Sequence, residues 1–79
     1  MERIRMIWDF RGPDAELTAA HHARHLKEFC DKEAITHYGH GHQLEQGQHY
    51  TAYVIIDKGD MIPVRDALRP VRATYETSP

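Results

Sequence analysis

The chain has 79 residues, the length of one domain, and a domain this small buries only a modest share of its surface. Its single cysteine, Cys30, excludes an internal disulfide and, without an apolar leader, is typical of a soluble protein of the reducing cytoplasm. The net charge of −2 with neutral histidines argues against a nucleic-acid partner. No run approaches the roughly 20 apolar residues that a membrane span needs.

The first predicted element is a strand over residues 3–10, where apolar and polar side chains alternate. Ile4, Met6, Trp8 and Phe10 share one face of this strand, and Arg3, Arg5, Ile7 and Asp9 share the other. The first face is the better candidate for the core.

A helix is predicted from Asp14, a candidate N-cap, to about Lys32, because the apolar period lengthens to that of a helix. Gly12 and Pro13 end the preceding strand. The apolar stripe of this helix consists of Ala15, Ala19, His22, Leu26 and Phe29, with Cys30 at its edge.

Two further strands are predicted over residues 34–43 and 48–57, joined by a turn around Gln46-Gly47. This register places Gly39 and Gly41 opposite Val54 and Ala52, on the side that faces the helices. The glycines would then form the floor of a hollow under the first helix. Tyr38, His40 and His42 would form a row on the other side, where imidazoles could make self-association depend on pH.

A second, short helix is predicted from Asp60 to about Arg69, because Pro70 disfavours helical backbone in the residue before it. Residues 71–77 alternate again and predict a last strand, with Val71, Ala73 and Tyr75 on one face.

The order βαββαβ predicts one α+β domain over residues 1–79 with a ferredoxin-like arrangement. Its four strands would form one antiparallel sheet in the order 4-1-3-2, with both helices on one face. Ile7, Tyr53, Ile55 and Tyr38 would lie on the bare face. Because large exposed apolar patches mark interfaces, we expect this face to pack on a second copy in a homodimer. The alternative is a half-solvated sheet.

Several histidines are candidates for chemistry. His22 lies on the apolar stripe of the first helix, and it is either a core histidine or a pocket acid/base. In the second case His25 could share the role, with His37 or Asp9 as partner. The alternative, which the position of Asp9 beside the turn favours, is a turn residue that bonds the local backbone. His21 and His25 are four residues apart, a helical metal-ligand spacing, but two ligands do not complete a zinc site.

The stretch HHARHLKEFCDKEAITHYG, residues 21–39, resembles the YCII-related group of the dimeric α+β barrel superfamily. The resemblance rests on the pair His25-Leu26 and on Phe29, Ile35 and Gly39, and it covers about a quarter of the chain. It implies a ferredoxin-like protomer, dimerisation of sheet on sheet and a cleft for a small molecule.

Three functions remain open at this point, and none calls for a cofactor. The first is a homodimer that binds a small organic molecule between the first helix and the sheet. The second is a non-catalytic interaction or regulatory protein that uses the bare sheet face. The third is a metal-binding protein that uses His21, His25 and a strand histidine.

Overall fold

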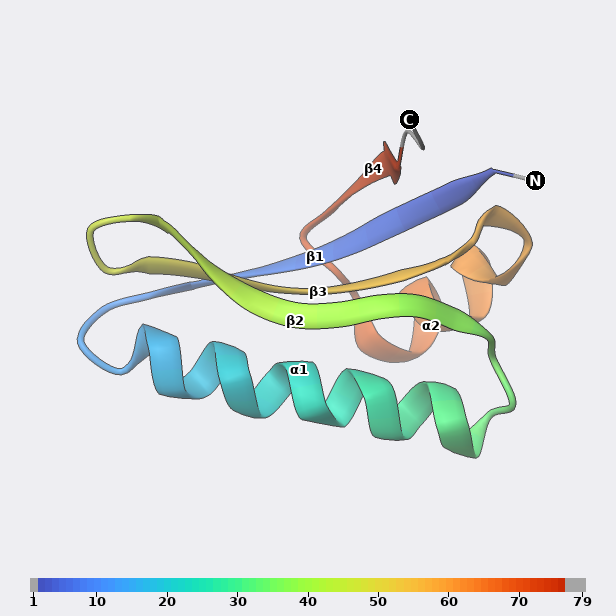
Figure 1. Ribbon diagram of the computed structural model, residues 1–79, viewed down its shortest axis with the longest axis horizontal. Coiled ribbons are helices and arrows are strands. Elements are labelled where there is room, and N and C mark those ends of the chain that lie inside the picture. Colours follow the sequence, from blue (N-terminus) through green and yellow to red (C-terminus); the bar gives the residue numbers. More distant parts are fainter. Residues whose placement is uncertain (1, 77–79) are drawn as a thin grey trace.

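The computed structural model describes residues 2–76 and confirms the predicted order of elements (Figure 1). Thr77, expected in the last strand, lies outside the described residues. The elements are β1 (Arg3–Arg11), α1 (Ala15–Lys32), β2 (His37–Gln46), β3 (His49–Asp57), the 3-10 turn η1 (Lys58–Asp60), α2 (Met61–Leu68) and β4 (Arg72–Glu76).

The four strands form one antiparallel sheet in the order β2-β3-β1-β4, which is the predicted order read from the other edge. Both helices lie on the same side of this sheet (Figure 1). We call that side the helix face and the opposite side the open face. The core lies at the helix face, where the side chains of Met6, Val54 and Ile56 are almost completely buried.

Helix α1 lies on the sheet through a stripe that is rotated slightly from the predicted one. Ala23 and Cys30 are buried, whereas His22 and Phe29 are only half-buried. Alanines on the buried stripe let the helix lie close to the sheet, so longer side chains move to its flanks. Asp14 is at the predicted N-cap position but makes no side-chain capping hydrogen bond.

Helix α2 ends at Leu68, next to Arg69, whose left-handed φ of 49° turns the chain toward Pro70. Val64 is its fully buried residue. The indole Nε1 of Trp8 donates a hydrogen bond of 2.9 Å to the carbonyl of Leu68. This bond ties the end of α2 to the central strand β1.

The predicted register of the hairpin was wrong over the middle of β2. The turn lies at Gly47 and Gln48, one residue later than expected, and the pairing then shifts at Glu45 and again at Tyr38. Each shift inserts one extra residue into β2, as a β-bulge does, and each turns the following side chains over. Gly39 pairs with Ile55, and Gly41 pairs with Tyr53.

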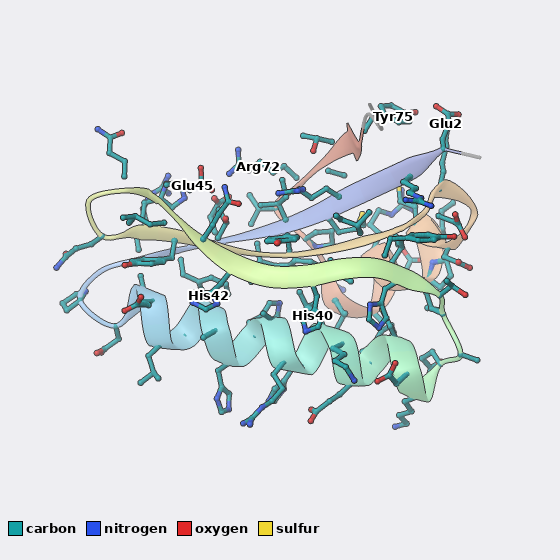
Figure 2. All side chains as sticks on the ribbon, viewed as in Figure 1. Glu2, His40, His42, Glu45, Arg72 and Tyr75 are labelled. Atoms are coloured by element: carbon teal, nitrogen blue, oxygen red, sulfur yellow. The ribbon has the colours of Figure 1, made fainter. Side chains whose placement is uncertain are left out.

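Between the two shifts, every side chain therefore lies on the face opposite to the predicted one. His40 and His42 pair with Val54 and Ala52 and point toward α1 rather than away from it (Figure 2). The expected row of imidazoles on the open face and the glycine floor under α1 are both corrected by this register. His37 lies opposite Ile56 on the helix face, and Tyr38 lies on the open face, as predicted.

The open face exposes less apolar surface than expected. Ile7 is only 8% exposed, and Tyr53 and Ile55 are half-buried within a single chain. The guanidinium of Arg5 lies 4.3 Å from the centre of the Tyr53 ring. A Cβ built on Gly41 would be 3.1 Å from the Tyr53 hydroxyl, so this glycine makes room for the ring to lie across β2.

Candidate functional site

His22 lies between helix and sheet, but against aromatic rings rather than at a cleft. Its ring centre is 5.1 Å from that of Trp8 and 5.4 Å from that of Phe10. Its Nε2 atom is buried and has no hydrogen-bond partner within residues 2–76. Burial lowers the pKa of His22, and the charge of His25 lowers it further. The surroundings therefore favour a neutral imidazole.

His21 and His25 lie side by side on the exposed surface of α1, with their ring centres 5.0 Å apart. A shallow hollow of about 260 Å³ is lined there by Leu17, Ala20, His21 and Arg24. Within the described part of the chain, no group of three or more His, Cys, Asp or Glu side chains could hold a metal ion. The pair thus has the helical spacing of metal ligands without a third ligand.

His37 is half-buried on the helix face, at the start of β2. Its Nε2 atom lies 3.5 Å from Oδ1 of Asp31, and Oδ2 of the same carboxylate accepts a hydrogen bond of 2.8 Å from Lys27. Its ring meets that of His40 edge to face, with centres 5.6 Å apart. The carboxylate nearest to His37 is therefore one that already forms an ion pair with Lys27.

Asp9 lies on the open face, so the sheet separates it from His22 and His37. Its Oδ1 atom is 2.7 Å from Nε2 of His49 and 3.0 Å from a guanidinium nitrogen of Arg72. The Asp9 side chain is 14% exposed and that of His49 is 21% exposed. The expected pairing of Asp9 with a histidine of the helix side is thus replaced by a pairing with His49.

Strand register explains why these three side chains meet. Asp9 is paired with Thr51 across β1 and β3, and His49 is the next residue along β3 on the same face. Arg72 is paired with Ile7 across β1 and β4, and Ile7 is the neighbour of Asp9 on the same face of β1. Long side chains reach such diagonal neighbours in antiparallel sheets.

A second carboxylate, that of Glu45, lies on the same face. It accepts hydrogen bonds of 2.9 Å from the Thr51 hydroxyl and 2.7 Å from the Gln43 amide. Glu45 and Arg72 both lie on the side of the sheet away from α1 (Figure 2). We call Asp9, His49, Arg72, Thr51 and Glu45 the open-face cluster.

The contacts in this cluster keep both carboxylates ionised. Burial acts to raise the pKa of Asp9, but the hydrogen bond from His49 and the charge of Arg72 outweigh it, so the pKa lies below its usual value. Hydrogen bonds from Gln43 and Thr51 lower the pKa of Glu45, and the charges of Arg72 and His49 add to this effect. The cluster therefore combines two carboxylates that stay charged with one guanidinium and one imidazole.

His49, Thr51 and Arg72 were not predicted as site residues, although the alternation pattern contained a signal for them. Asp9 shares a face with Ile7, and His49 shares a face with Tyr53 and Ile55, which were expected on the bare side. Arg72 alternates with Val71 and Ala73. Taken together, these alternation patterns indicate that Asp9, His49 and Arg72 lie on one face of the sheet.

No family model, curated protein or solved structure matches this chain. No helix among the described residues is long and apolar enough to cross a membrane. The case for a functional site therefore rests on the geometry of the open face.

Proposed function

We propose that this protein is a cytoplasmic homodimer of ferredoxin-like protomers that binds a small organic molecule at the open-face cluster. The observation that carries the proposal is the short contact of the Asp9 carboxylate with both His49 and Arg72 on the sheet face opposite α1 and α2. The proposal moves the predicted small-molecule site from the helix face to the open face.

A second copy of the chain is the occupant that suits the open face. The face offers half-buried Tyr53 and Ile55 for packing. It also carries charges of both signs, so a copy rotated about a twofold axis can set basic side chains against acidic ones. The charged side chains that the register and contacts place there are Arg3, Arg5, Arg11 and Arg72 and Asp9, Glu45 and Asp57. The resemblance to the dimeric α+β barrel superfamily supports the same arrangement.

The position of the cluster suits a small ligand at the rim of such a dimer. His49 directly follows the turn at Gly47 and Gln48, and Asp9 is two residues from the end of β1. The cluster thus lies toward one end of the sheet, where a facing copy would leave an opening. Ligand-binding sites commonly place a few convergent polar groups beside apolar side chains, and Tyr53 supplies an apolar wall here.

Sedimentation equilibrium tests the dimer. Ile55→Glu adds a charge to the centre of the open face and should convert a dimer into a monomer, because an unpaired buried charge is costly. Leu17→Glu is the matched control, since Leu17 is 72% exposed on the outer surface of α1. A wild-type protein that stays monomeric at high concentration would contradict the dimer.

Backbone NMR with a set of small carboxylic acids, amines and amides tests the ligand site. We expect at least one compound to shift the amide resonances of His49 and Thr51, and His49→Gln to abolish the shift. His25→Gln is the control, because His25 lies on α1, on the other side of the sheet. Shifts confined to α1, or none at all, would contradict a site on the open face.

A further inference from the structure

We infer that His49 is a general base, with Asp9 as its positioning residue, and that it activates water for attack on small acyl compounds. This inference rests on the proposed function for the position of the site, but it does not depend on the dimer. It adds an activity to a site that is otherwise proposed only to bind.

The contact with Asp9 selects the tautomer of His49. A carboxylate accepts hydrogen bonds, so the 2.7 Å contact places a proton on Nε2 of the imidazole. The neutral ring then carries its lone pair on Nδ1, the ring nitrogen that does not contact Asp9. A histidine fixed in this way by a carboxylate is the usual form of a catalytic base.

Arg72 prevents the carboxylate from taking the proton itself. Its guanidinium shares the Oδ1 atom that receives His49, at 3.0 Å, and so keeps Asp9 anionic. When the imidazole gains a proton, the anionic Asp9 stabilises the resulting imidazolium without becoming protonated. Arg11, paired with His49 directly across β1 and β3, adds a cation close to the place where a negatively charged acyl intermediate would form.

No other histidine of residues 2–76 has this arrangement. His37 approaches Asp31 only to 3.5 Å and shares that carboxylate with Lys27. His22 packs against aromatic rings with its Nε2 atom unpartnered. The short carboxylate contact thus distinguishes His49 from a generic surface imidazole.

The proposed step balances as a hydrolysis. Nδ1 of His49 takes a proton from water while the water oxygen bonds to the carbonyl carbon of an ester. The tetrahedral intermediate then expels the alcohol oxygen, and the proton on Nδ1 passes to the leaving group or to solvent. Ester and water become carboxylic acid and alcohol, and His49 returns to its neutral form.

The test uses hydrolysis of p-nitrophenyl acetate by the full chain, followed by release of p-nitrophenolate. His49→Gln should lower the second-order rate constant by about tenfold or more, the low side of what general bases contribute. His37→Gln removes the other histidine near a carboxylate and should leave the rate within a factor of about two, since a misaligned base contributes little. Equal rates for wild type and His49→Gln would overturn the inference.

Asp9→Asn separates positioning from a merely structural role. It should lower the rate, because the imidazolium loses its anionic partner, whereas Asp9→Glu keeps a carboxylate and should retain part of the rate. A rate that Asp9→Glu lowers as much as Asp9→Asn would assign Asp9 a structural role and overturn its part in the inference.

Diethyl pyrocarbonate, which acylates an unprotonated imidazole nitrogen, tests the wild-type chain without any substitution. Mass spectrometry should find His49 modified before His37, and the reverse order would count against a free Nδ1 on His49. A monomer whose hydrolysis still requires His49 would contradict the proposed dimer and leave the inference intact. A dimer that binds small molecules and hydrolyses the ester equally well without His49 would contradict only the inference.

Discussion

The hydroxyl of Tyr38 donates to both carboxylate oxygens of Asp57, at 3.0 and 2.9 Å, across the point where β2 shifts its register on β3. Tyr38 is the extra residue of that shift, and the Arg3 guanidinium lies 3.8 Å from the centre of its ring. Three strands thus contribute one side chain each to the place where the pairing is irregular. This contact holds the bulge on the open face.

The Tyr38–Asp57 contact predicts a measurable change in tyrosine ionisation. The hydrogen bond to Asp57 raises the pKa of Tyr38, and burial and the Asp57 charge act in the same direction. Asp57→Asn removes the anionic acceptor, so Tyr38 should ionise at lower pH than in the wild type. The ring-carbon resonance of Tyr38 in an NMR titration reports this, with Tyr50 as internal reference. An unchanged Tyr38 titration would show that the bond is absent in solution.

The two glycines of β2 should respond differently to an added methyl group. A Cβ on Gly41 would lie 3.1 Å from the Tyr53 hydroxyl, whereas one on Gly39 would lie 3.6 Å from Cδ1 of Ile55, an ordinary contact. Gly41→Ala should therefore be less stable than Gly39→Ala by about 1 kcal/mol, the low end of the cost of overpacking. Denaturant unfolding measures the difference, and a shift of the Tyr53 ring resonances should accompany Gly41→Ala alone. Equal stability of the two variants would place the Tyr53 ring elsewhere.

The two leucines of α1 predict how strongly the helix depends on its buried stripe. Leu26 is 1% exposed, and Leu26→Ala should reduce the free energy of unfolding by about 2–5 kcal/mol through lost burial and a cavity. Leu17 is 72% exposed, and Leu17→Ala should change it by no more than about 0.5 kcal/mol. Thermal or denaturant unfolding compares the pair. A large loss at Leu17 would mean that another surface covers the outside of α1.

The half-buried position of His22 predicts lower stability in acid. Its pKa in the folded chain lies below the ordinary value of 6.5, so the unfolded chain takes up the proton first as the pH falls. Neutral His22 therefore contributes its full stabilisation to the folded chain above pH 6.5, the ordinary pKa. This stabilisation is lost as the pH falls from 6.5 toward the pKa of the folded chain. His22→Leu should therefore flatten the decline in unfolding free energy between about pH 7 and 5, the range of histidine titration. His21→Gln, on the exposed surface of α1, is the control and should leave the decline in place.

Much of the fold could be predicted because its signals are local. Each element can be identified from its own residues. Residues 3–10 alternate as a strand does, the helical stripe begins at Ala15, and Pro70 limits the second helix. The bulges at Glu45 and Tyr38 could not be predicted in this way, because their contacts join residues that are not neighbours in the sequence. Glu45 bonds Thr51, six residues away, and Tyr38 bonds Asp57, nineteen residues away.

The candidate site was harder to predict than the fold, for the same reason. The sequence predicts that Asp9 could orient a histidine, but the predicted partner, a histidine of the helix side, lies on the other side of the sheet. The contact with His49 spans 40 residues and the contact with Arg72 spans 63. His37, His40 and His42, the histidines predicted as a partner of His22 or as an open-face row, all lie on the helix face.

Trp8 is the chain's single tryptophan, and it connects the central strand with both helices. Its ring meets His22 of α1, and its indole N–H is bonded to the last carbonyl of α2. An undocking of either helix must therefore change the surroundings of the same fluorophore. The intrinsic fluorescence of Trp8 should consequently report the docking of both α1 and α2 on the sheet, without any added label.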